Sequence, residues 1–328
     1  MFPARDRMTA GAKYHIPTTL PMTQGFIRMK QHSAPDTRSL LPFPALIDAL
    51  AQAALDTAAG QIRCPERTTI PTRDQRGALM SMPCVGDDIM VTKLLTLFAG
   101  NTAHNLPTIQ GQVICAEALA GRFLFTLDGP TVTMRRTAAI SLLGIRTFAR
   151  GPVRRVLLIG TGTQAIAHLQ ALAAIYPGMT VVIRGRTPER TQAFCAAHTM
   201  PGLNVRPEQA DEDPFDVVLT LTASTSVIYN EPARASCLVI GVGAYRTDMV
   251  EIGPATIAGS TLYVDDPVGA PTEAGDLYQA GVDWQHVHPL AQALQGRLPA
   301  PDQPVFFKSV GCAAWDLAAC RVARQQGG

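Results

Sequence analysis

A glycine-rich turn near the middle of the chain has the residue types and spacing of a dinucleotide-binding loop. The sequence G-T-G-T-Q-A at 160–165 follows the apolar run 156–159 and opens a stretch with helical periodicity. The first glycine permits a tight turn, the second lets the backbone approach a pyrophosphate, and the third position, here Ala165, needs only a small side chain. An ordinary strand-to-helix turn is the alternative, but the position at the head of a β-α-β unit favours the cofactor site. The candidate ligands are Gly160, Gly162, Thr163 and Gln164.

The residues about 20 positions further on predict which dinucleotide binds, because NAD sites usually carry Asp or Glu there for the ribose 2′-hydroxyl. Here 183–187 reads I-R-G-R-T and contains no acid. A guanidinium pairs with phosphate in bidentate geometry, and a threonine hydroxyl adds a donor. The alternative is that these arginines are solvated surface charges. We predict NADPH, with NADH as a weaker donor, and the candidate ligands are Arg184, Arg186, Thr187 and Arg190.

Lysine is rare in this chain, and one lysine stands in an apolar segment. Only Lys13, Lys30, Lys93 and Lys308 occur, and Lys93 lies inside the strand-like run 89–97. An ammonium is costly to bury unless it is paired or titrates. Lys93 is therefore predicted to bind a carboxylate or, with a lowered pKa, to pass a proton. The alternative is a strand position that faces solvent.

The first half of the chain shows a helix followed by short strands. Apolar residues at a spacing of four and a closing glycine predict a helix at 41–60. Apolar runs separated by turn signals predict antiparallel strands at 78–82, 89–98, 109–116 and 123–127. A second helix is expected at 132–149. Residues 1–30 are expected to form a disordered tail, with Met29 as an alternative start.

The second half alternates strands and helices, as a doubly wound parallel sheet does. The predicted fold class is α/β, a Rossmann-type domain together with an α+β domain. The expected strands are 153–159, 180–183, 216–221, 237–242 and 261–264, and the expected helices are 164–176 and 188–198. The segments 305–310 and 312–324, a last strand and helix, are expected to return to the first domain.

Composition excludes several functional classes. The chain has 47% apolar and 16% charged residues and a net charge of +2, with no block of basic residues, so no nucleic-acid partner is expected. No apolar run approaches the roughly 18 residues of a membrane span, and no secretory signal is evident. The seven cysteines form no C-x-x-C pair and lie in apolar stretches. We expect reduced core thiols in a cytoplasmic protein, and no metal site.

Several blocks in order resemble the ornithine cyclodeaminase/mu-crystallin family, and the resemblance covers residues 41–322. The blocks are L-P-F with A-L-I-D-A-L (41–50), T-K (92–93) with G-N (100–101), R-T-A-A (136–139), G-x-G-x-Q (160–164), G-R-T (185–187), G-V-G-A (241–244), V-D (264–265) with E-x-G-D (273–276), and F-K-S-V-G (307–311).

The resemblance implies a homodimer with a substrate-binding and dimerisation domain at 31–138, completed by 305–328, and an NADP-binding Rossmann domain at 139–304. It also implies substrate-binding positions at Arg67, Lys93 and Arg136, which would hold the carboxylate of a small amino or imino acid. Positions expected near the cofactor are Thr108, Arg136, Thr137, Ser224, Val242 and Ser309. Glu251, Asp265 and Asp276 also stand in family blocks, where capping or turn roles explain them equally well.

The chain departs from the cyclodeaminases of the family at Tyr245, where those enzymes carry an Asp for ammonia loss and ring closure. A phenol with a pKa near 10 is a poor base at neutral pH. The favoured activity is therefore NADPH-dependent reduction of cyclic imino acids, Δ1-pyrroline-2-carboxylate to L-proline and Δ1-piperideine-2-carboxylate to L-pipecolate, with Lys93 as the candidate catalytic residue. The alternatives are an ornithine cyclodeaminase, an alanine or N-alkyl-amino-acid dehydrogenase, and a non-catalytic NADPH-binding protein.

Overall fold

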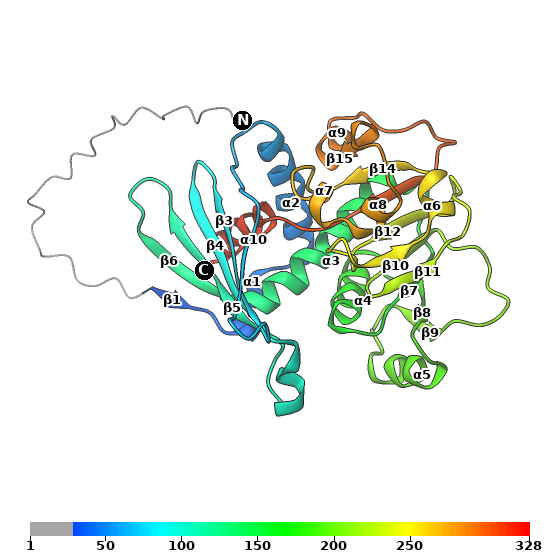
Figure 1. The fold of residues 1–328 in the computed structure, drawn as a ribbon, viewed down its shortest axis with the longest axis horizontal. Coiled ribbons are helices and arrows are strands. Elements are labelled where there is room, and N and C mark those ends of the chain that lie inside the picture. Colours follow the sequence, from blue (N-terminus) through cyan, green and yellow to red (C-terminus); the bar gives the residue numbers. More distant parts are fainter. Residues whose placement is uncertain (1–28) are drawn as a thin grey trace, which may run out of the picture.

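The computed structural model describes residues 29–328, which form two main sheets joined by one long helix (Figure 1). The predicted α/β class, with a Rossmann-type parallel sheet beside a mainly antiparallel one, is confirmed. Most of the predicted tail lies outside the described residues. Its predicted end is wrong, because Lys30 begins a short strand that pairs with Phe125 of the first sheet.

The first sheet has six strands in the order β1-β6-β5-β4-β3-β2. They are β1 (Lys30–Gln31), β2 (Thr68–Pro71), β3 (Ala78–Val85), β4 (Ile89–Leu97), β5 (Ile109–Glu117) and β6 (Phe123–Asp128). The predicted strands among them are antiparallel, as expected, while β1 runs parallel to β6. Alternate residues of β4, including Val91 and Lys93, are buried. Lys93 therefore faces the core and not solvent.

Helices cover the inner face of this sheet. The helices of this part are α1 (Ala34–Leu40), α2 (Phe43–Ala58), the 3₁₀ turn η1 (Ala99–His104) and α10 (Ala313–Gln325). Helix α10 packs against α2, β3 and β4. It is buried over most of its length, with Trp315, Leu317 and Cys320 fully or nearly fully enclosed, and only its last turn reaches solvent.

The second sheet has eight parallel strands in the order β15-β14-β16-β12-β10-β7-β8-β9. They are β7 (Arg155–Ile159), β8 (Thr180–Arg184), β9 (Asn204–Pro207), β10 (Val217–Thr220), β12 (Leu238–Gly241), β14 (Thr261–Val264), β15 (Val287–Pro289) and β16 (Val305–Lys308). The chain moves from β7 to one side and returns at β10 on the other. This reversal creates a switch point between β7 and β10, where doubly wound sheets bind ligands.

One predicted assignment is wrong. Strand β16 lies between β12 and β14 in the parallel sheet, not in the first part of the chain, and only α10 returns there. All four residues of β16 are buried, as expected for a strand covered on both faces. The remaining elements are α4 (Thr163–Ile175), α5 (Pro188–Ala197), α6 (Pro254–Ala258), α7 (Ala270–Glu273), α8 (Gly275–Gln279), η2 (Trp284–His286), α9 (Leu290–Leu294) and the two-stranded pair β11 (Thr225–Tyr229) and β13 (Val250–Ile252).

Helix α3 (Gly129–Phe148) runs between the two sheets and contacts β5 on one side and α4 and β12 on the other (Figure 1). Asp128 caps its start and accepts a hydrogen bond from the amide of Thr131 at 2.9 Å. The predicted domain boundary at 138/139 falls inside this continuous helix. Residues on α3 can therefore contribute to both halves of a site between the sheets.

The described helices include none with the length and apolar character that a membrane crossing requires. All seven cysteines are free thiols; five are buried and two are partly buried. Their predicted place in the core is confirmed. The described residues form no cluster of three or more potential metal ligands.

Candidate active site

A cavity of about 310 Å³ lies between the two sheets, beside the carboxyl ends of β10, β12 and β16. Its lining includes the cations Arg67, Lys93 and Arg136 together with Gln164, Val242 and Ser309. Small-molecule sites span roughly 300–1,000 Å³, so the cavity has the expected size. A larger hollow of about 770 Å³ beside the β2–β3 turn contains none of the predicted residues. The three predicted substrate positions line the smaller one, together with five of the predicted cofactor positions: Arg136, Thr137, Gln164, Val242 and Ser309.

Lys93 is fully enclosed and paired with a carboxylate from α10. Its Nζ lies 3.0 Å from Oδ2 and 3.2 Å from Oδ1 of Asp316, and both side chains are at most 1% exposed. Burial lowers the pKa of Lys93 to about 8; Asp316 opposes the change, while Arg136 and Arg67 add to it. Lys93 is thus mainly charged at neutral pH and close enough to titration to exchange a proton.

Arg136 shares the same carboxylate at a longer distance. Its Nε lies 3.8 Å from Oδ1 of Asp316, and this buried nitrogen has no hydrogen-bond partner among residues 29–328. A side chain at Gly311 would collide with the Arg136 guanidinium, so the glycine makes room for it. A buried donor without a partner is costly. Arg136 also lines the cavity, so its guanidinium is a candidate partner for a ligand carboxylate.

Arg67 is held by one nitrogen only. Its Nη2 lies 2.6 Å from Oε2 of Glu273 and donates to the backbone oxygens of Gly311 at 2.6 Å and Val310 at 3.2 Å. The hydrogen bonds of Arg67 within the described chain all use Nη2, which leaves Nη1 and Nε for a ligand. Burial raises the pKa of Glu273 to about 7, although Arg67 opposes the rise.

The described wall of the cavity carries cations and no acid. Arg67, Lys93 and Arg136 line the cavity, whereas their carboxylate partners Asp316 and Glu273 do not. A substrate carboxylate would therefore meet positively charged side chains. The residues that line the cavity include no Asp or Glu within the described chain.

Asp265 shapes the backbone turn that carries Ser309 into the cavity wall. It accepts hydrogen bonds from Ser309 Oγ at 2.8 Å, the amides of Val310 at 2.9 Å and Gly311 at 3.0 Å, and Trp315 Nε1 at 3.1 Å. This buried carboxylate thereby fixes the two carbonyl groups that hold Arg67. It explains the family position of Asp265 without contact to a ligand.

The glycine-rich turn fits a dinucleotide. Gly160 has φ +129°, and a side chain there would press on the backbone of Leu221. Gly162 precedes α4 and faces open space, so a pyrophosphate can approach the amides of Thr163 and its neighbours. Gln164 lines the cavity, and its buried Oε1 has no hydrogen-bond partner among the described residues. These features suit a nicotinamide cofactor, whose carboxamide offers a donor.

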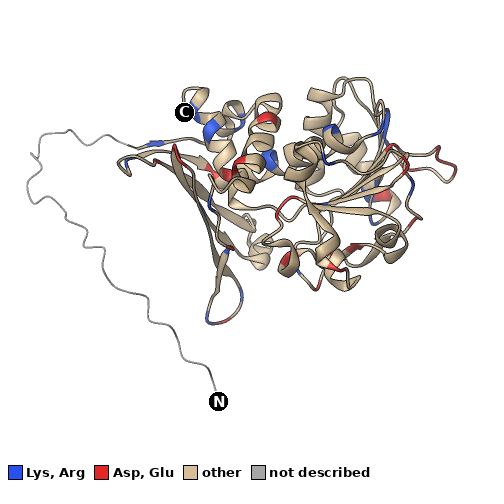
Figure 2. Cartoon of the chain, turned by 90° about the horizontal axis from the view of Figure 1, so that it is seen from above, with Lys and Arg blue, Asp and Glu red and all other residues tan. Residues whose placement is uncertain are grey.

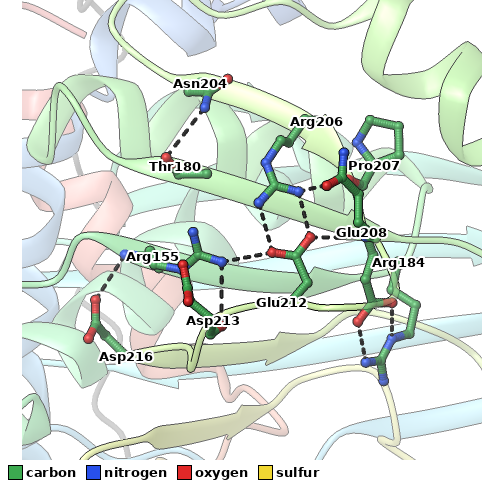
Figure 3. Close-up of polar contacts among 11 residues, drawn as sticks. Arg155, Thr180, Arg184, Asn204, Arg206, Pro207, Glu208, Glu212, Asp213 and Asp216 are labelled. Carbon is green, nitrogen blue, oxygen red and sulfur yellow. Dashed lines mark hydrogen bonds and ion pairs between the residues drawn. The ribbon is translucent and has the colours of Figure 1, made fainter.

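In the predicted 2′-phosphate site, one arginine is paired with an acid and two are exposed to solvent. Arg184 forms a bidentate pair with Glu208, with Nε at 2.6 Å from Oε2 (Figure 3). The positive charge of Arg184 is therefore already balanced by Glu208. Arg186 and Arg190 are exposed, and Thr187 caps α5. A side chain at Gly185 would collide with Thr191, so the position cannot carry the acid typical of NAD sites.

The other predicted residues are placed unevenly. Thr137, Val242 and Ser309 line the cavity, whereas Thr108 and Ser224 do not. The hydroxyl of Ser224 donates to the backbone oxygen of Ser226 at 2.6 Å and so closes a turn. Tyr245 lies at the cavity edge and is 44% exposed.

Sequence reasoning missed Asp316 as a site residue and left Glu273 without a role. Asp316 could have been found from the sequence, because it is the one acid in the apolar stretch A-A-W-D-L-A-A-C at 313–320. A buried acid needs a partner, and Lys93 is the buried cation in reach. Glu273 offered no such signal, because only the fold brings it to Arg67.

Comparisons with known proteins show which family the chain resembles in sequence. The family profile described as ornithine cyclodeaminase/mu-crystallin matches residues 29–327. The chain is 50% identical over 293 residues to the Δ1-pyrroline-2-carboxylate/Δ1-piperideine-2-carboxylate reductase of Azospirillum brasilense, covering 89% of this chain and 94% of that one. It is 47% identical to a Δ1-pyrroline-2-carboxylate reductase of Burkholderia multivorans, with the same coverage.

The fold is also shared with solved structures. The Δ1-pyrroline-2-carboxylate reductase of Thermococcus litoralis, in complex with NADH and L-proline, superimposes with a TM-score of 0.81 at 22% identity, over 91% of this chain and 97% of that one. An archaeal alanine dehydrogenase with bound NAD gives 0.80 at 20% identity, over 91% and 95%. The chain belongs to the ornithine cyclodeaminase/mu-crystallin family.

Proposed function

We propose that this chain is an NADPH-dependent reductase of small cyclic imino acids. It would convert Δ1-pyrroline-2-carboxylate to L-proline and Δ1-piperideine-2-carboxylate to L-pipecolate. The observation that carries the proposal is that Arg67, Lys93 and Arg136 line a cavity beside the dinucleotide turn whose described lining contains no acid. The activities of the reductases that are 47–50% identical support it.

The residues of the chain act on the substrate by holding its carboxylate. Arg67 offers Nη1 and Nε, Arg136 offers the part of its guanidinium that lines the cavity, and Lys93 offers its ammonium. Together they would fix the orientation of the C=N carbon. Hydride transfer to this carbon is the chemistry that a bound nicotinamide would supply. Lys93 holds the proton that completes the N–H bond, and Asp316 stabilises its charged form.

The cavity does not favour cyclodeamination. The side-chain ammonium of ornithine would need an acid, and none lines the cavity within the described chain. Tyr245 stands where cyclodeaminases have Asp, and its phenol is partly in solvent. A cyclic imino acid has no separate side-chain ammonium, so it fits the apolar wall of Met80, Met82 and Leu95 better than ornithine does.

The cofactor preference and the assembly belong to the same proposal. Arg186, Arg190 and Thr187 would receive the 2′-phosphate, and NADH would be a weaker donor. A homodimer would cover the outer face of the six-stranded sheet, where Leu79 and Leu94 are 41% and 39% exposed. The strands there carry few charges (Figure 2). A cytoplasmic enzyme without nucleic-acid or membrane partners is the expected context.

The test is oxidation of NADPH at 340 nm in the presence of Δ1-pyrroline-2-carboxylate. Parallel reactions contain NADH, ornithine with NAD⁺, and pyruvate with methylamine. The proposal predicts rapid oxidation with the cyclic imine and a preference for NADPH. Formation of proline and ammonia from ornithine, or activity only with added amine, would replace it with a cyclodeaminase or an N-alkyl-amino-acid dehydrogenase.

A further inference from the structure

Glu251 is a fully buried carboxylate behind the cofactor side of the cavity, and the reaction outlined above does not use it. It lies on β13 with 0% exposure and does not line the cavity. Burial raises its pKa, and Lys308 opposes the rise. A buried acid of this kind is costly unless its hydrogen bonds are complete.

Two loops that line the cavity converge on this one side chain. From the loop after β10, Thr222 donates to Oε1 through its amide at 2.5 Å and its hydroxyl at 2.8 Å. From the loop after β12, the amides of Gly243 and Ala244 donate to Oε2 at 2.7 Å and 3.2 Å. A side chain at Gly243 would collide with the Thr222 backbone, so the loops touch where the carboxylate joins them.

The backbone at Glu251 is held in turn by a second buried carboxylate, Asp276. The amides of Glu251 and Ile252 donate to Oδ1 of Asp276 at 2.6 Å and 2.9 Å. Oδ2 of Asp276 lies 2.8 Å from Nζ of Lys308 at the end of β16, and both side chains are fully buried. A continuous polar chain thus runs from β16 through α8 and β13 to both loops.

We infer that Glu251 is a positioning residue for the nicotinamide end of the cavity, acting through the backbones of Thr222 and Gly243. The inference rests on the proposed function, because it takes the wall formed by Leu221, Thr222 and Val242 as the nicotinamide site. By locking both loops, the carboxylate sets the distance between the hydride donor and the clamped imine carbon without touching either.

Only an ionised carboxylate satisfies this arrangement. Both oxygens of Glu251 accept from backbone N–H groups, which are donors in every state. A glutamine would turn an NH₂ group toward one of the two loops and push it away. The isosteric change Glu251→Gln therefore separates positioning from simple packing.

The experiment compares wild type, E251Q and the control E212Q. Glu212 is also a largely buried acid, but it pairs with Arg155 and Arg206 at the far end of the sheet (Figure 3). Binding of NADP⁺ and of 2′-phospho-ADP-ribose, which lacks nicotinamide, is measured by calorimetry together with kcat and KM.

For E251Q we expect kcat to fall by about 100-fold, because small misplacement of reacting groups has effects of that order. NADP⁺ affinity should fall while affinity for the fragment changes less than about twofold, and E212Q should show neither effect.

Equal weakening of both ligands in E251Q, or an unchanged kcat, would overturn the inference. If E251Q does not fold, Thr220→Val gives a milder test, because it removes one hydroxyl donor 3.0 Å from Oε2 outside the cavity. It should lower kcat and NADP⁺ affinity a fewfold while sparing the fragment, and loss of fragment binding instead would contradict the role. Failure of wild type to reduce the imine would count against the proposed function alone, because the ligand-binding comparison does not need turnover.

Discussion

The cations of the cavity differ in how completely the protein satisfies them, and this difference suggests their roles. Lys93 has a close carboxylate partner, Arg67 is anchored by one nitrogen, and Arg136 has a buried Nε without a hydrogen-bond partner within residues 29–328. Charges that the fold leaves incompletely paired are available to a ligand. At this scale the account predicts that each cation contributes to substrate binding.

On the proposed function, replacing Lys93 by Met or Arg67 by Ala would remove a charged donor to the substrate carboxylate. We expect kcat/KM for the cyclic imine to fall by roughly 10- to 100-fold in each variant, because such a hydrogen bond contributes about 1.5–3 kcal/mol. Steady-state kinetics on folded variants checks this, with the exposed Arg73→Ala as control. A loss of only a fewfold in both variants would show that the clamp is assigned to the wrong residues.

The pKa of Lys93, lowered to about 8, gives substrate binding a pH dependence. The ammonium is present below this pKa and is lost as the pH rises through it. The KM for the imine should therefore rise above pH 8 in wild type. In Lys93→Met the KM should be higher at neutral pH and lack this rise. A wild-type KM that stays flat from neutral pH to well above 8 would contradict the role of the ammonium.

The cofactor preference is predicted to depend on Arg186 more than on Arg184. Arg186→Ala should lower the NADPH-to-NADH ratio of kcat/KM by roughly tenfold or more, since it removes a phosphate partner. Glu208→Gln should raise the ratio, because it releases the guanidinium of Arg184. The ratio measured for the three proteins decides the matter, and an unchanged ratio in Arg186→Ala would exclude this site for the phosphate.

At the scale of elements, α3 lies so close to β16 at Gly144 that no larger side chain fits there. A Cβ at Gly144 of α3 would lie 2.6 Å from Cδ1 of Phe307, a fully buried side chain of β16. Alanine normally stabilises a helix interior by about 0.5–1 kcal/mol relative to glycine. Here the collision should outweigh that gain.

Gly144→Ala is therefore expected to lower the free energy of unfolding by about 1–2 kcal/mol, the usual cost of overfilling a core. Gly151→Ala, where no atom lies within 4 Å of the added carbon, serves as the control. Chemical denaturation of both variants gives the comparison. A Gly144→Ala variant as stable as the control would mean that α3 and β16 can shift apart without cost.

Local patterns predicted most elements but not their partners. The apolar runs that form β3 to β6, and the alternation of strands and helices from β7 onward, could be predicted because turn residues separate them. The run V-F-F-K of β16 was recognised as a strand and assigned to the wrong sheet. The sequence of four buried residues does not specify which strands they pair with, because the order of strands depends on the whole sheet.

At the scale of the molecule, the two sheets bring together residues more than 200 positions apart. The Lys93–Asp316 and Arg67–Glu273 pairs join the first sheet to elements that follow the parallel sheet's first strands. The predicted clamp residues meet in one cavity, whereas their counter-charges escaped prediction. Motifs predict which residues bind phosphate or carboxylate, but the acids that pair with those residues become visible only in the fold.

The central claim is that the cavity recognises an imine through its carboxylate and reduces it with NADPH. The most direct measurement compares initial rates of NADPH oxidation with Δ1-pyrroline-2-carboxylate and with Δ1-pyrroline, which lacks the carboxylate. The account predicts a kcat/KM roughly 10⁴-fold higher for the acid, because a site built around a charged group rejects the analogue without it. Equal rates for the two imines, or no oxidation with the acid, would contradict it.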